Sequence, residues 1–209
     1  DHRDLHLSLR RQRQMCIRDR LLIEKFSIRH PHVHVCLDIQ SDDERIEWMV
    51  LENQGFGIAV STGRNRNIKK HELLGTEAVC LLPVSHRLAA NEVISPEDLV
   101  GENFISYFEG SIFKNDIDKA FNTAKVRRLT RYEGKTTGAI IGMVGAGLGV
   151  SIIDSGFGAG SFDPRCIAIP FKPAIPYTAE LLWSTQRDLS AIQNEFLNMV
   201  REEFAGLDI

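Results

Sequence analysis

Residues 104–153 read FISYFEGSIFKNDIDKAFNTAKVRRLTRYEGKTTGAIIGMVGAGLGVSII, and two kinds of pattern alternate along them. Three short segments have the composition of buried strands, at residues 104–107, 129–133 and 149–153. Two segments between them carry apolar side chains at helical spacing, at residues 112–121 and 136–145. Strand–helix–strand repetition of this kind predicts βαβ units with mostly parallel strands, so the predicted fold class is α/β.

The same alternation continues on both sides of this stretch. Upstream, a helix ends at Pro31, VHVCLDI (33–39) alternates as a strand, and a helix opens at Ser41 before the strand 55–60. Further strands are predicted at 76–83, 166–171 and 177–184, and an amphipathic helix at 189–204. This order of elements suits two small α/β lobes joined by strands that pass from one lobe to the other.

Composition and charge exclude several classes of protein. The 209 residues are 43% hydrophobic and 25% charged, which is ordinary for a globular protein and argues against disorder. No apolar run reaches the roughly 20 residues of a membrane span, and no export signal is visible, so we expect a cytoplasmic protein without membrane contact. The net charge of -3 argues against nucleic-acid binding by this chain itself.

The charge is uneven along the chain. Residues 1–20 hold six arginines and three aspartates, a net charge of +3, so the remaining 189 residues hold -6. A basic leader before an acidic body would suit a nucleic-acid tail. A segment foreign to the fold is the simpler interpretation.

Residue types that carry catalysis or bind metals are present, but not in the required arrangements. The cysteines are scattered without a CxxC pair, at Cys16, Cys36, Cys80 and Cys166, and the histidines of HPHVH (30–34) lack a nearby carboxylate. The glycines of AGLGVS (146–151) follow a helix and enter a strand, the reverse of a phosphate-binding loop, so we expect them to end the helix and turn the chain. Without a nucleophile elbow, P-loop or HExxH motif, the sequence predicts no enzyme, no cofactor and no metal.

Polar residues follow several predicted strands at their carboxyl ends. They are Ser41, Ser61, Ser106 with Tyr107, and the run Lys135, Thr136 and Thr137. Open α/β sheets place ligands at this edge, because loop N–H groups and helix starts converge there. The alternative for Ser41, Thr136 and Thr137 is that they only cap helices.

Three stretches together resemble one known family. HPHVHVCLDI (30–39), HELLGTEAVCLLPVSHRLAANEVISPEDLVGENFISY (71–107) and GAIIGMVGAGLGVSIID (138–154) resemble the effector-binding domain of LysR-type transcriptional regulators, over residues 21–205. Within that family, the sequences of these stretches are most similar to those of the group that includes regulators of lysine synthesis and opine catabolism. The resemblance implies a type 2 periplasmic-binding-protein fold, with lobe one at 21–75 and 180–209, lobe two at 76–179, and an effector in the cleft between them. TEAVCLLP and PYTAELLW become the two crossing strands.

The resemblance also implies a site and partners. The family's effector contacts correspond to Ser41 or Asp42, Ser61, Ser106, and Lys135, Thr136 and Thr137. The implied effector is a small amino-acid-like metabolite, such as a basic amino acid or an opine, and the implied assembly is a homodimer or homotetramer. DNA would be bound through a helix-turn-helix that is expected upstream and absent from this chain.

Residues 1–20 match neither the first strand of the family's lobe one nor its linker helix. We therefore expect that strand to be missing and residues 1–20 to be a non-family leader. A solute-binding protein of a transport system shares the fold and is the alternative function. It would need an export signal and a longer second lobe, so the regulator is favoured.

Overall fold

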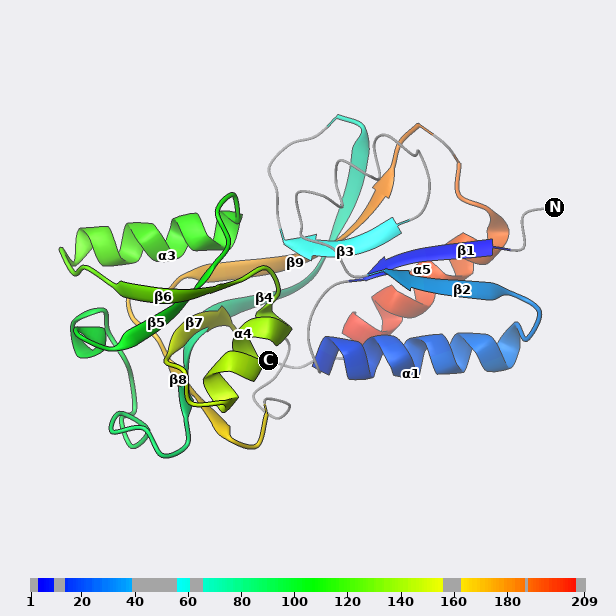
Figure 1. The fold of residues 1–209 in the computed structure, drawn as a ribbon. Helices are drawn as coiled ribbons and strands as arrows, with labels where there is room; N and C mark the ends of the chain where they lie inside the picture. The colour runs from blue at the N-terminus through cyan, green and yellow to red at the C-terminus, as the bar shows by residue number, and fades with distance from the viewer. Residues whose placement is uncertain are drawn as a thin grey trace. The chain divides into compact units, whose positions relative to one another are not determined.

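A computed structural model describes residues 4–9, 14–38, 56–60, 66–155, 163–186 and 188–205 (Figure 1). The chain forms two compact units. Unit 1 comprises Asp1–Arg10, Met15–Gly75 and Thr178–Ile209, and unit 2 comprises Arg11–Gln14 and Thr76–Tyr177. Two strands, β4 (Ile68–Pro83) and β9 (Pro176–Ser184), run across the boundary between the units.

Unit 1 contains a mixed sheet with helices packed against it. Its other described elements are β1 (Asp4–Leu9), α1 (Gln14–Arg29), β2 (His34–Asp38), β3 (Phe56–Val60) and α5 (Ala191–Ala205). β1 lies between β2 and β3 and is parallel to both, while β9 pairs antiparallel with β3. Leu7 is therefore level with Leu37 on one side and Phe56 on the other.

The expectation that the first strand is missing is wrong. Residues 4–9 form β1, the strand that joins β2 to β3 (Figure 1). The physical reason is visible in DLHLSL, where Leu5, Leu7 and Leu9 alternate with polar residues at the period of a strand. The surrounding arginines conceal this short pattern. In addition, α1 begins at Gln14, so its first turns also lie within the expected leader.

The core of unit 1 is built around three phenylalanines from three elements. Phe196 of α5 meets Phe26 of α1 edge to face at 5.0 Å and lies 5.4 Å from Phe56 of β3, measured between ring centroids. All three side chains are fully buried. Burial of each aromatic side chain contributes on the order of 2–3 kcal/mol, so this cluster fixes both helices to the sheet.

Unit 2 contains the parallel strands expected from residues 104–153. Its elements besides β4 are η1 (Glu97–Leu99), β5 (Asn103–Tyr107), α3 (Ile112–Thr123), β6 (Leu129–Gly134), α4 (Thr137–Gly145), β7 (Ser151–Asp154) and β8 (Cys166–Pro170). β5 pairs with β6 in parallel, and a parallel bridge between Phe104 and Val150 joins its other side to the entrance of β7. β4 pairs antiparallel with both β7 and β8.

The glycines after α4 act as the sequence predicts. The helix is followed by Ala146 as its C-cap and by Gly147, whose φ of 76° is left-handed. Gly149 then passes so close to β5 that a Cβ atom there would lie 2.2 Å from the Asn103 carbonyl oxygen. The glycines of AGLGVS therefore allow the helix to end and the following strand to pack closely against β5. This confirms the prediction that they end the helix and turn the chain.

One strand begins well before its predicted start. β4 begins at Ile68 rather than at Thr76, because the polar run from Lys69 to Glu72 conceals its first half in the sequence. The helix predicted to open at Ser41 lies outside the described residues.

Candidate functional site

The carboxyl ends of β5 and β6 lie side by side and are followed by the start of α4. Ser106 is paired in register with Glu133, and Tyr107 with Gly134. α4 begins at Thr137, so its first N–H groups, which have no partner inside the helix, lie at the same edge of the sheet. This arrangement gathers hydroxyl and N–H donors at one place.

Ser106 is the most unusual residue at this edge. Only 2% of its surface is exposed, yet within the part of the chain that the structure describes its hydroxyl makes no hydrogen bond. Ser151, buried in neighbouring β7, instead donates a 2.7 Å hydrogen bond to the Ile105 carbonyl. Because the Ser106 hydroxyl has no partner among the described residues, it has a hydrogen-bonding capacity that a ligand could use.

A hydrogen bond between two hydroxyl groups joins β5 to α4. The Tyr107 and Thr137 hydroxyl oxygens are 2.6 Å apart, and both residues are buried. The Tyr107 ring also meets Phe113 of α3 edge to face at 5.3 Å. Tyr107 is recognisable in the sequence as a residue at a strand end, but its pairing with Thr137 depends on the alignment of β5 with β6.

The predicted site residues have different roles in the structure. Ser106 ends β5, and Lys135, Thr136 and Thr137 follow β6 at the same edge. Thr136 caps α4 by accepting a 3.1 Å hydrogen bond from the Ala139 N–H, which is the alternative that the sequence left open for it. The other predicted residues, Ser41, Asp42 and Ser61, lie outside the described residues.

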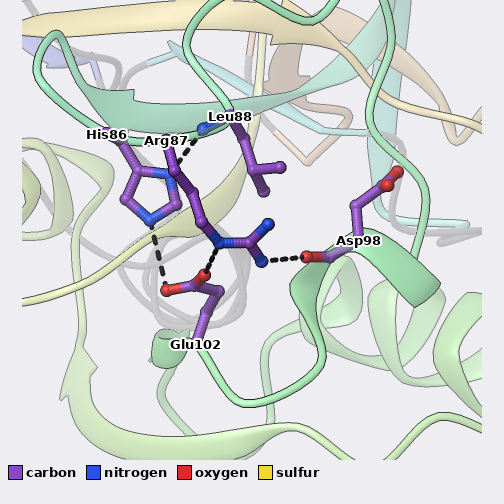
Figure 2. Close-up of polar contacts among 5 residues, drawn as sticks. All are labelled: His86, Arg87, Leu88, Asp98 and Glu102. Carbon is purple, nitrogen blue, oxygen red and sulfur yellow. Dashed lines mark hydrogen bonds and ion pairs between the residues drawn. The ribbon is translucent and has the colours of Figure 1, made fainter.

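The opposite, amino end of β5 holds an ion-pair network built from the conspicuous SHRLA and SPEDLVGEN motifs (Figure 2). Glu102, directly before β5, contacts the Arg87 Nε at 2.8 Å and the His86 Nε2 at 3.2 Å. Arg87 also donates to the Asp98 carbonyl at 2.9 Å, which ties η1 to the loop after β4. The network therefore anchors the loops that lead into β5.

The chemistry of this network indicates a structural role. The Leu88 N–H donates to the His86 Nδ1, so Nε2 carries the proton that is donated to Glu102 (Figure 2). Burial alone would raise the pKa of the Glu102 carboxyl, but the hydrogen bonds from Arg87 and His86 lower it below its ordinary value. Glu102 is thus held as a carboxylate.

The described residues hold neither a metal-binding cluster nor an activated cysteine thiol. They contain no group of three His, Cys, Asp or Glu side chains that could hold a metal ion, and no helix long and apolar enough to cross a membrane. Burial raises the pKa of the Cys80 thiol, and burial together with Asp163 raises that of Cys166 to about 11. Both thiols are therefore protonated at neutral pH and poor nucleophiles.

Known proteins similar in sequence are bacterial regulators. The transcriptional activator protein LysR of Escherichia coli is 27% identical over 175 residues, which cover 84% of this chain and 56% of that protein. The regulatory protein NocR of Agrobacterium tumefaciens is 28% identical over 176 residues, covering 84% and 58%. The chain spans little more than half the length of these curated relatives.

Solved structures show the same fold. The regulatory domain of CcmR from Synechocystis, in complex with 2-PG, superposes with a TM-score of 0.81 at 19% identity, covering 98% of both chains. The effector-binding domain of QuiR in complex with shikimate gives a TM-score of 0.79 at 15% identity, again over 98% of both. This is the type 2 periplasmic-binding-protein-like fold. A family model described as LysR substrate binding domain matches residues 20–205, and on that evidence this chain belongs to the LysR substrate-binding domain family.

Proposed function

We propose that this chain is the effector-sensing part of a LysR-type transcriptional regulator and that its effector is a small amino-acid-like metabolite with a carboxylate. The observation that carries the proposal is Ser106, a buried serine whose hydroxyl makes no hydrogen bond to any described residue. It stands at the carboxyl end of β5, beside the start of α4. Relatives named as regulators, and structural neighbours that hold 2-PG or shikimate, support a sensor rather than an enzyme.

The chemistry of the strand ends suits a carboxylate. An oxygen of the ligand accepts a hydrogen bond from the Ser106 hydroxyl, and the positive end of the α4 dipole favours its negative charge. Lys135, exposed at the turn before α4, adds a cation at the same edge. Thr137 acts indirectly, because its bond to Tyr107 holds α4 against β5.

The remaining parts of the proposal come from the family. Ser41 or Asp42, and Ser61, supply further contacts to the effector. The ligand is a basic amino acid or an opine. The complete regulator is a homodimer or homotetramer that contacts DNA through a helix-turn-helix outside this chain.

Two buried serines, Ser106 of β5 and Ser151 of β7, allow a matched test. Ser106→Ala removes a hydroxyl that is free to bind a ligand, whereas Ser151→Ala removes one that is bonded to the Ile105 carbonyl. Loss of a hydrogen bond to a charged group costs about 1.5–3 kcal/mol, so Ser106→Ala is expected to weaken binding by about ten- to a hundredfold. Its melting temperature should stay close to that of the parent.

The measurement is titration calorimetry with L-lysine, L-arginine and an arginine-derived opine. Ser151→Ala is expected to lower the melting temperature while binding the same ligands as tightly as the parent. Equal affinity of Ser106→Ala and the parent would show that the effector does not bind at the carboxyl end of β5.

A further inference from the structure

We draw no further inference here: the strongest candidate, the surface patch of exposed apolar side chains that Val100, Leu129 and Leu148 place around the amino end of β5, carries none because nothing in the described part of the chain shows what covers it.

Discussion

The two ends of β5 satisfy their polar groups in opposite ways. At the amino end, Glu102 contacts both Arg87 and His86, and the Asn103 carbonyl is packed closely against Gly149. At the carboxyl end, the hydroxyl of the buried Ser106 makes no hydrogen bond to any described residue. The amino end of β5 therefore holds the fold, whereas its carboxyl end retains hydrogen-bonding capacity. Substitutions at the amino end should therefore change stability without changing affinity, and those at the carboxyl end the reverse.

The largest effect is expected at Gly149. A Cβ atom would lie 2.2 Å from the Asn103 carbonyl oxygen and 2.9 Å from its carbon, and backbone atoms cannot yield as a flexible side chain would. Gly149→Ala should therefore lower the free energy of unfolding by about 3 kcal/mol, measured by denaturant titration. Gly142→Ala is the control, because that glycine lies in α4 with open space around it and should stabilise the protein by about 0.5–1 kcal/mol. Similar behaviour of the two variants would contradict a close contact at Gly149.

An intermediate effect is expected at Glu102 and depends on pH. Because the folded state lowers its pKa, the ionised carboxylate stabilises the fold fully above the ordinary value of 4.5, and this contribution is lost as the pH falls through the lowered folded pKa. Glu102→Gln should cost about 1–2 kcal/mol at neutral pH, and the difference from the parent should shrink on acidification below about pH 4.5.

Urea titrations of both proteins at neutral and acidic pH measure that difference. Glu92→Gln, at an exposed position, is the control and should not change stability at neutral pH. A Glu102→Gln penalty that stayed constant between neutral pH and pH 3 would show that the charge of Glu102 is not what stabilises the amino end.

The smallest effect is expected at Lys125, which follows the C-cap of α3 and has a left-handed φ of 57°. The Val126 N–H reaches back to the Phe121 carbonyl at 3.0 Å, and this helix-ending turn usually contains glycine. Lys125→Gly should raise the free energy of unfolding by about 0.5–1 kcal/mol without changing ligand affinity. Lys119→Gly, inside the same helix, should lower it by about 1 kcal/mol. Thermal melts that ranked the two variants the other way would show that the turn does not strain Lys125.

The parts of the fold that were predictable are those with a local signature. Alternating strand and helix patterns between residues 104 and 153 predict β5, α3, β6 and α4 from side-chain spacing alone. β1 and the first half of β4 were not predicted, because short strand patterns rich in charged or polar residues do not stand out from their surroundings. Their strand conformation depends on pairing partners far away in the sequence.

The same distinction applies to the site. Ser106 could be predicted because a strand end is recognisable from neighbouring residues. The Tyr107–Thr137 bond depends on which strands lie side by side and in what register. Sequence spacing does not determine that alignment.

Unit 1 is built from chain segments that lie before and after unit 2, so the two units become complete at different times during synthesis on the ribosome. Unit 2 is complete once Tyr177 has been made, whereas unit 1 still lacks β9 and α5 at that moment. Phe196, which packs between Phe26 and Phe56, is then not yet part of the nascent chain. Domains fold as units when their residues become available, so unit 2 can finish first and the apolar face of unit 1 stays uncovered until the last helix is synthesised. Unit 1, whose first strand is made before any strand of unit 2, is therefore the last to close its core.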